Sequence, residues 1–294
     1  MKQAILITAY KNYFHLEKII NFFDSDFQIY IHLDRKSDIT DHEREKIENY
    51  PQVKLLVQEY KVNWGGLNHL KAILYLSTMA VEDKENVYFH LISGHDHPIK
   101  NLEFFKLFYQ RHGHRNFLEY FKVPFKGWGG NGGLDRLEYF NLFDIFNYKS
   151  DTESRWINNS LQLQRKLGLK RGFGVDFPEI YGGSTWWSLN RDALTYVLDY
   201  QEDHPSYLKR FRHTLCSEEF FFQTILLNSP FLESINNNNL RYIDWTPRNG
   251  NNPAVLDETD YQKIAQSDAL FARKFDYPVS CRLMEQLSES KISK

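Results

Sequence analysis

Two hydrophobic periods alternate along the first 120 residues, and this alternation constrains the fold more than any other feature of the chain. Short apolar runs, several of them rich in Val, Ile and Tyr, are typical of buried strands and occur at residues 4–9, 27–33, 53–57, 87–92 and 117–121. Apolar residues at helical spacing predict helices at residues 13–23, 41–48, 67–81 and 101–111. Because such alternation produces a mostly parallel sheet flanked by helices, the sequence predicts an α/β fold.

The pattern is less regular after residue 135. Apolar spacing there predicts helices at residues 134–146, 156–169, 192–200, 218–227 and 257–266, and strands at 182–189 and 240–245. No internal repeat or long linker divides the chain. We therefore expect one domain over residues 1–294, with a nucleotide-binding half at about 1–122 and an acceptor and catalytic half at about 123–280.

Charge and hydropathy exclude several classes of protein. The chain has 36 basic and 38 acidic residues, a net charge of −2, which excludes a nucleic-acid binder that depends on a strong overall positive field. The N-terminal apolar run is too short for a signal peptide, and no stretch approaches the roughly 18 apolar residues of a membrane span. We expect a cytoplasmic protein with reduced cysteines, in at most peripheral contact with the inner membrane surface.

Polar and aromatic residues follow the predicted strands, where parallel sheets bind ligands. Tyr10 follows the first strand, Asp34 the second, and residues 93–98 the fourth, while Trp64 opens the helix between the third and fourth strands. These residues predict a nucleotide-sugar pocket, although Asp34 fits a turn or helix-capping carboxylate equally well. The glycine-rich segment 127–133 lies too late for a dinucleotide fingerprint and predicts a flexible loop, with a substrate lid as the alternative.

Several motifs in order along the chain resemble the core-2/I-branching N-acetylglucosaminyltransferase and peptide xylosyltransferase family. They are IHLDRKS at 31–37, WGG at 64–66, LISGHDHPIK at 91–100, GSTWWSL at 183–189, SEEFFFQT at 217–224, YIDW at 242–245 and LFARKF at 270–275. The resemblance spans about residues 4 to 276 and implies a GT-A fold. It also implies a UDP-sugar donor, inversion at the anomeric carbon, and catalysis without a metal or other cofactor.

Inverting transfer requires a general base for the acceptor hydroxyl, and the resemblance assigns that role to Glu219. Its neighbour Glu218 would project about 100° away on a helix, so only one of the two can point squarely into a site. We expect Glu218 to contact the substrate. The structural alternative for both is a helix N-terminus with Ser217 as its cap and the carboxylates in the first turn.

The departing diphosphate requires positive charge, and the resemblance assigns it to Lys274. Arg273 and Arg248 are the candidate partners of Lys274, because the family's second basic residue has no clear counterpart in this sequence. The alternative for Arg273 and Lys274 is a solvated basic patch.

The triplet His95-Asp96-His97 occupies roughly the place of the Asp-x-Asp of metal-dependent GT-A enzymes, where the family usually has uncharged or aromatic residues. On an extended segment His95 and His97 would share a face and Asp96 would point away, so we expect hydrogen bonds from Ser93, His95 and Asp96 to the acceptor and no bound metal. A Mn²⁺ site using the two histidines is the alternative. Trp186 and Trp187 could stack on a sugar ring, with one of them in the core.

Together these features predict an inverting glycosyltransferase that moves a sugar from UDP to a hydroxyl of a carbohydrate acceptor, free or lipid-linked. We expect the sugar to be N-acetylglucosamine and the role to be bacterial surface-polysaccharide synthesis, since animal relatives carry a membrane anchor that this sequence lacks. The competing hypothesis is a non-catalytic protein that binds carbohydrate or nucleotide sugar on the same scaffold. A binding protein needs no base, so the presence of both acidic and basic candidates favours an enzyme.

Overall fold

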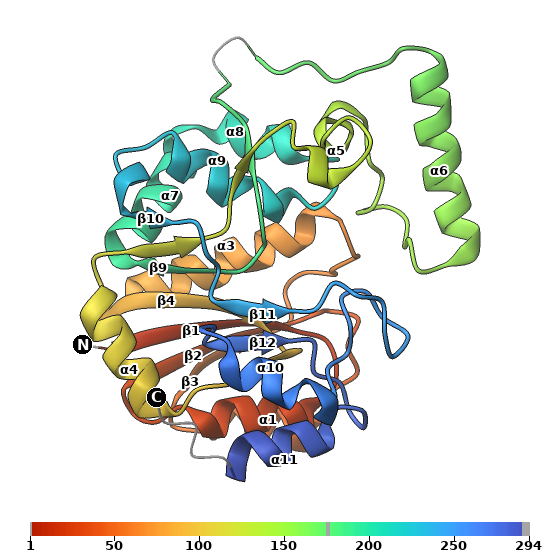
Figure 1. Ribbon diagram of the computed structural model, residues 1–294. Helices are drawn as coiled ribbons and strands as arrows, with labels where there is room; N and C mark the ends of the chain where they lie inside the picture. Colours follow the sequence, from red (N-terminus) through yellow and green to blue (C-terminus); the bar gives the residue numbers. More distant parts are fainter. Residues whose placement is uncertain (1, 175–176, 290–294) are drawn as a thin grey trace.

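The computed structural model describes residues 2–174 and 177–289, so both ends of the predicted domain extend slightly beyond the described residues (Figure 1). Within those ranges, seven strands form the main sheet in the order β10-β6-β9-β4-β1-β2-β3. The strands are β1 (Lys2–Ala9), β2 (Phe27–Leu33), β3 (Val53–Val57), β4 (Asn86–Ser93), β6 (Asn116–Leu118), β9 (Trp187–Asn190) and β10 (Ile235–Asn236). β9 runs antiparallel to β4 and β6, and the other pairs are parallel. The predicted α/β fold with a mostly parallel sheet is confirmed.

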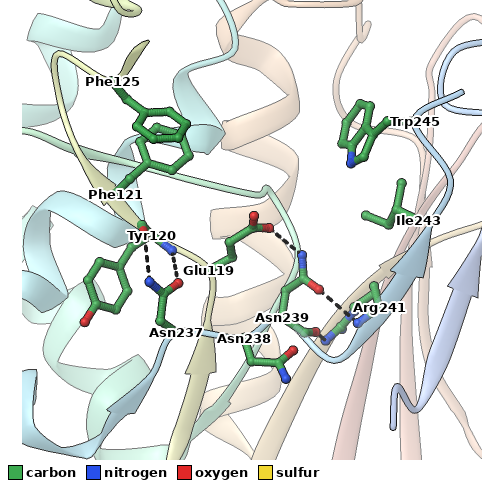
Figure 2. A pocket seen from close by; sticks show the side chains of 10 residues that line it. All are labelled: Glu119, Tyr120, Phe121, Phe125, Asn237, Asn238, Asn239, Arg241, Ile243 and Trp245. Atoms are coloured by element: carbon green, nitrogen blue, oxygen red, sulfur yellow. Dashed lines mark hydrogen bonds between the residues drawn. The ribbon is translucent and has the colours of Figure 1, made fainter. Parts of the chain in front are cut away.

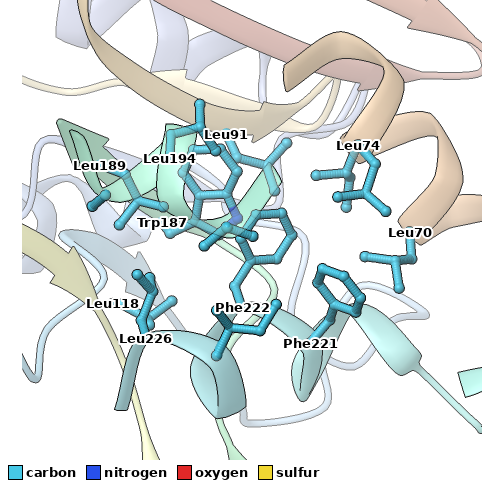
Figure 3. Close-up of a cluster of buried hydrophobic side chains, with 14 of the residues drawn as sticks. Leu70, Leu74, Leu91, Leu118, Trp187, Leu189, Leu194, Phe221, Phe222 and Leu226 are labelled. Carbon is cyan, nitrogen blue, oxygen red and sulfur yellow. The ribbon is translucent and has the colours of Figure 1, made fainter. Parts of the chain in front are cut away.

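Side chains of β1 alternate between the two faces of the sheet, as the strand period of two requires. Ala4 and Leu6 pack on one face against α3 (Leu67–Glu82), α7 (Arg191–Asp203) and α9 (Phe221–Leu227). Ile5 and Ile7 pack on the opposite face against α1 (Tyr13–Phe22), α2 (Asp41–Glu48) and α4 (Leu102–His112). Figure 3 shows the first of these cores, in which Trp187 and Phe222 lie between the sheet and the helices.

A smaller sheet lies at the carboxyl end of β4 and consists of β11 (Arg241–Ile243), β12 (Phe271–Arg273) and β5 (Asp96–Pro98). β12 pairs antiparallel with β5, so Arg273 lies opposite Asp96. The pairing of β11 with β12 is parallel and sets Ile243 beside Arg273. This small sheet therefore brings the C-terminal basic residues to the strand ends of the N-terminal half.

The remaining elements are short. They are β7 (Phe121–Lys122), η1 (Lys126–Trp128), α5 (Leu134–Glu138), α6 (Asp151–Lys166), β8 (Tyr181–Gly182), α8 (Pro205–Phe211), η2 (Ser217–Glu219), η3 (Leu232–Ser234), η4 (Glu258–Asp260), α10 (Tyr261–Gln266) and α11 (Cys281–Glu289). Across the two described ranges, no helix is long and apolar enough to cross a bilayer.

Several predicted elements are wrong in extent. The strand expected at 182–189 is divided into β8 and β9, and the helix expected at 156–169 lies at 151–166. The helix expected at residues 134–146 ends at Glu138, because the Asn141 side chain donates to the carbonyls of Arg136 and Tyr139, and such bonds compete with helix continuation. Further on, the carboxylate of Asp144 accepts the amides of Leu67 and Asn68 at the start of α3. The helix expected at 218–227 is divided into η2 and α9 at Phe220, whose φ of −123° is not helical.

Candidate active site

Glu219 lies on η2, a single 3-10 turn held by backbone hydrogen bonds to Gly65 and Gly183. Cys216 precedes the turn in the left-handed conformation and its amide donates to the carbonyl of Gly65. The carbonyl of Glu219 accepts the amide of Gly183 at 2.9 Å. The expectation that Ser217 caps a helix is wrong, because Cys216 holds the cap position and the buried Ser217 hydroxyl has no hydrogen-bond partner among the described residues.

The Glu219 carboxylate is paired with a cation and still reaches solvent. Its Oε2 accepts a hydrogen bond from Arg136 Nη1 at 2.6 Å, and the Arg136 guanidinium lies 4.0 Å from the ring centre of Trp128. The Glu219 side chain is 27% exposed. Burial raises the pKa of Glu219 to about 7, against the lowering effect of Arg136. A carboxylate with this pKa can accept a proton near neutral pH.

Glu218 has different surroundings, with only 6% of its side chain exposed. Its Oε1 is 2.9 Å from His69 Nδ1, and His69 Nε2 is 3.2 Å from the Thr8 hydroxyl. The other Glu218 oxygen is buried and has no hydrogen-bond partner within the described part of the chain. These contacts tie η2 to α3 and β1, and they leave Glu219 as the more accessible of the two carboxylates.

Cations gather around Lys274, immediately after β12. Burial lowers the pKa of the Lys274 ammonium, and repulsion from Arg273, Lys149 and Lys11 lowers it further. Lys149 and Lys11 both lie over the ring of Tyr10, at 5.4 and 5.7 Å from its centre. Asp276 offsets part of this charge by accepting from Lys11 at 2.7 Å. A concentration of positive charge at strand ends is suited to a phosphate group.

Arg273 lies between the cations and the glutamates. Its guanidinium stacks 4.2 Å from the ring centre of Trp186, and its buried Nε has no partner among the described residues. Burial lowers the pKa of Arg273, while the carboxylates of Asp96 and Glu219 raise it. Arg273 is therefore within electrostatic reach of both Glu219 and the Lys274 cluster.

Arg248 does not partner Lys274, contrary to the sequence-based expectation. Its guanidinium forms ion pairs with Asp257 at 2.8 Å, Asp260 at 2.5 Å and Asp244 at 3.6 Å. Asp257 and Asp260 are held in place as a capping box at the start of η4. Three carboxylates compensate the charge of Arg248, so Lys11 and Lys149, which the sequence reasoning missed, are the better partners for Lys274.

The triplet His95-Asp96-His97 is buried and bonded within the protein. Both histidines lie against Phe275: His95 Nδ1 is 2.9 Å from its carbonyl oxygen, and the His97 ring is 5.1 Å from its ring. Asp96 points to Ser93 instead and accepts its amide at 2.7 Å. The predicted alternation is confirmed, but Ser93 and Asp96 bind each other. Among the described residues, no three His, Cys, Asp or Glu side chains group as metal ligands.

Asp34 adopts the turn role that the sequence left open. Its Oδ1 accepts the backbone amides of Lys36 and Val62 at 3.0 and 3.1 Å. Tyr10 is exposed at the end of β1, with its ring centre 5.2 Å from that of His95. Trp64, in the loop after β3, is also exposed, and its ring centre lies 5.5 Å from that of Tyr148. Tyr10 and Trp64 therefore remain open to a ligand, whereas Asp34 supports the turn.

Trp187 is the tryptophan of this pair that lies in the core, so it is wrong as a substrate contact, whereas stacking of Trp186 on a sugar stays a prediction. Trp187 is fully buried in the core and lies 5.0 Å from the ring of Phe222. Trp186 lies beneath the Arg273 guanidinium and 6.4 Å from the ring of His69. Trp186 therefore links the cationic group to the residues that hold η2.

A cavity of about 560 Å³ lies between residues 119–125 and 237–245 (Figure 2). Its lining residues are Glu119, Tyr120, Phe121, Phe125, Asn237, Asn238, Asn239, Arg241, Ile243 and Trp245. Trp245 and Ile243 lie across the cavity from the stacked rings of Phe121 and Phe125, and Asn239 donates to Glu119 at 2.8 Å. Gly183 joins the cavity to η2: it bonds Glu219, and a Cβ on it would lie 1.9 Å from the carbonyl oxygen of Glu119.

Sequence reasoning missed Arg136, His69, Lys11 and Lys149. Arg136 follows the glycine-rich segment, which the structure shows as η1 and tight turns with Trp128 packed against the ring of Phe220 at 5.0 Å. His69 comes three residues after the WGG motif, and that spacing was the one signal that could have indicated it. The pairing of Arg136 with Glu219 spans 83 residues, and no local pattern marks it.

Comparison with known proteins relates the chain to sugar-transferring enzymes. It is 27% identical to Xylosyltransferase 1 of Mus musculus over 95% of this chain and 29% of the relative, and 26% identical to Xylosyltransferase oxt of Drosophila melanogaster over 88% and 30%. The chain thus spans about 30% of the length of these curated relatives.

A structural similarity to S. aureus TarS has 18% identity and a TM-score of 0.31, and covers 40% of this chain and 21% of that one, too little to support a common fold. A family model described as Core-2/I-Branching enzyme matches residues 4–266. Because that match covers most of the sequence, the chain belongs to the Core-2/I-Branching enzyme family.

Proposed function

We propose that this protein is an inverting glycosyltransferase of the GT-A type, which transfers a sugar from a UDP-sugar to a hydroxyl of a carbohydrate. One arrangement carries the proposal: the accessible Glu219 carboxylate lies on the same turn as Glu218, whose partner His69 is 6.4 Å from the Trp186 ring on which Arg273 stacks, beside Lys274. Burial raises the pKa of Glu219 to about 7, as a base near neutral pH requires. An inverting transfer requires a base for the acceptor hydroxyl and a site of positive charge for the departing diphosphate.

In the proposed reaction, the acceptor hydroxyl gives its proton to the Glu219 carboxylate. The acceptor oxygen forms a bond to the anomeric carbon from the face opposite the leaving group, while the bond from that carbon to the phosphate oxygen breaks. The electron pair leaves with UDP, and Lys274, Lys11, Lys149 and Arg273 offset its negative charge. These cations would supply the stabilisation that a divalent metal provides in other enzymes, so we expect transfer without a metal.

The cavity in Figure 2 is the proposed acceptor site. Trp245 offers an aromatic face for the apolar side of a sugar ring, and Asn237 and Asn238 offer amides for hydroxyl groups. Gly183 places this cavity next to the backbone of Glu219. An acceptor hydroxyl at that end of the cavity would approach the proposed base.

The donor is proposed to be UDP-N-acetylglucosamine or UDP-xylose. The resemblance in the motifs led us to expect the first, whereas relatives named xylosyltransferases favour the second. A role in bacterial surface-polysaccharide synthesis at the cytoplasmic side of the inner membrane stays a prediction from the sequence.

The test combines donor binding with product release. UDP, UDP-N-acetylglucosamine and UDP-xylose are compared by thermal shift, and UDP release is then followed with the stabilising donor and a panel of sugar acceptors. We expect Glu219→Gln to bind the donor normally and to release UDP about a hundred to ten thousand times more slowly. Glu138→Gln, which removes a carboxylate bonded to Lys170 and outside the proposed machinery, is the matched control.

The outcomes distinguish an enzyme from a binding protein and decide which glutamate is the base. UDP release that depends on the acceptor and fails in Glu219→Gln supports the proposal. Donor binding without UDP release for any acceptor would favour the non-catalytic carbohydrate-binding alternative. Normal release in Glu219→Gln with loss in Glu218→Gln would move the base to Glu218.

A further inference from the structure

Exposed hydrophobic side chains concentrate around α6. Among the described residues, seven of the sixteen exposed large hydrophobic side chains fall between positions 140 and 169. They are Phe140, Ile145, Tyr148, Trp156, Leu163, Leu167 and Leu169. In Figure 1, α6 projects beyond the rest of the molecule at the right of the view. A soluble surface rarely collects so many large apolar groups without a partner.

The inner face of α6 is already satisfied by the protein. Ile157 is buried, and the Gln164 side chain bonds the amide and the carbonyl of Phe140 at 2.8 and 3.1 Å. On the outer face, Trp156, Leu163 and Leu167 are 55%, 56% and 59% exposed. Their spacing of seven and four residues aligns them on one side of the helix and its C-terminal turn. The unsatisfied apolar stripe is therefore a separate feature from the face that holds α6 in place.

Exposed basic side chains lie beside this stripe. Residues 149–171 contain six basic and two acidic residues. Lys170 pairs with Glu138, Arg165 lies 3.9 Å from Asp135, and Arg171 bonds the carbonyls of Tyr139 and Arg210, so the charge available beside the stripe is that of Arg155 and Lys166. The acidic residues, Asp151 and Glu153, lie in the first turn, and Glu153 accepts the amide of Asn147. The basic residues Arg155 and Lys166 are exposed beside the stripe. An apolar stripe flanked by basic side chains is the pattern of helices that bind at a membrane interface.

We propose that α6 docks on an anionic lipid surface, with Trp156, Leu163 and Leu167 entering the interface and Arg155 and Lys166 contacting the headgroups. Charge complementarity selects this occupant, because a second copy of the chain would bring the same positive charge to the contact. Lys149, just before α6, lies over the Tyr10 ring in the proposed phosphate site. The docked surface is therefore continuous in sequence with the donor site, but the proposal does not depend on the chemistry at Glu219.

Vesicle co-sedimentation tests the proposal with the full chain. Wild type is mixed with phosphatidylcholine vesicles that do or do not contain phosphatidylglycerol, at low and high salt. We expect binding to the anionic vesicles alone, weakened by salt. Leu163→Glu should lower the partition coefficient at least about tenfold, because a leucine is lost from the interface. Leu107→Glu, at a position on α4 that is 46% exposed, should bind as wild type does.

Control measurements separate loss of vesicle binding from loss of folding, loss of catalysis and dimer formation. Thermal melts confirm that each variant is folded, and Lys166→Glu tests the charge independently if Leu163→Glu is unstable. Glu219→Gln should bind vesicles normally, so failure of the proposed catalysis is distinguishable from failure of docking. Equal binding of Leu163→Glu and Leu107→Glu, or no binding of wild type to anionic vesicles, would overturn the proposal. A wild-type dimer in sedimentation velocity that Leu163→Glu dissociates, without vesicle binding, would assign the stripe to a second copy.

Discussion

Removal of the Arg136 guanidinium should shift the acid limb of the pH profile of the proposed transfer reaction upward. Burial raises the pKa of Glu219 to about 7, and Arg136, hydrogen-bonded at 2.6 Å, holds it from rising further. In Arg136→Gln that restraint is lost. A hydrogen bond to a charged group contributes about 1.5–3 kcal/mol, and one pKa unit corresponds to 1.36 kcal/mol, so the pKa should rise by about one to two units.

At neutral pH, the raised pKa of Glu219 should make Arg136→Gln slower than wild type. The base must be deprotonated, so at pH 7 the active fraction falls from about one half to between about one tenth and one hundredth, a loss of roughly five- to fiftyfold. Near pH 10 the two rates should converge, because the base is then mostly deprotonated in both proteins. The assay is kcat/KM for UDP release across pH 5.5 to about 10, with the donor identified by thermal shift.

Two control variants separate electrostatics from packing. Arg136→Lys keeps the charge and should return the limb toward neutrality, although the stacking on Trp128 is reduced. Arg165→Gln removes an exposed guanidinium 3.9 Å from Asp135 and should leave the profile unchanged. A limb that stays in place in Arg136→Gln, or moves to lower pH, would refute the assignment of Glu219 as a base restrained by Arg136.

Three further outcomes are expected. Lys274→Ala should remove about 2.7–4 kcal/mol of transition-state stabilisation and so slow transfer, while wild type should stay active in EDTA. Inactivation of wild type by EDTA that Mn²⁺ reverses would contradict this. Trp187→Ala should lower the free energy of unfolding by about 3–5 kcal/mol in urea titration, because Trp187 is fully buried beside Phe222; a change below about 1 kcal/mol would contradict the packing. In the folded protein Glu219 binds its proton more tightly than in the unfolded chain, so the free energy of unfolding of wild type should fall as the pH rises from about 4.5 to 7. Glu219→Gln should lack that fall, which is at most about 3 kcal/mol. Parallel curves of unfolding free energy against pH for the two proteins would contradict the raised pKa.

The fold could be predicted because its signal is local. The run at residues 4–9 and the periodic helix at 67–81 are each readable without the rest of the chain, and they correspond to β1 and α3. Parallel strands then carry Tyr10 and the residues after β4 to one edge of the sheet. The motif resemblance supplied Lys274, and the pairing of β12 with β5 brought it there.

The electrostatic partners could not be predicted, because long-range geometry decides them. Arg136 reaches Glu219 across 83 residues, after α5 has ended early at Glu138. Lys149 reaches the Tyr10 ring from the loop before α6, three residues beyond the helix predicted at 134–146, and no local pattern marks that contact. Arg248 was misassigned for the opposite reason: its carboxylate partners Asp257 and Asp260 follow within twelve residues and are brought close by a local capping box.

The contrast between Glu218 and Glu219 gives a physical reason for proposing Glu219 rather than Glu218 as the base, which the motif alone could not give. Glu218 is enclosed and bonded through His69 to Thr8, so its carboxylate is fixed to the body of the sheet. Glu219 is paired with Arg136, which lowers the pKa of Glu219 but leaves its side chain 27% exposed to solvent. A base must meet a substrate that arrives from solution and must release its proton afterwards, so it needs access as well as a tuned pKa. Glu219 has both, whereas the contacts of Glu218 suit it to hold η2 in position.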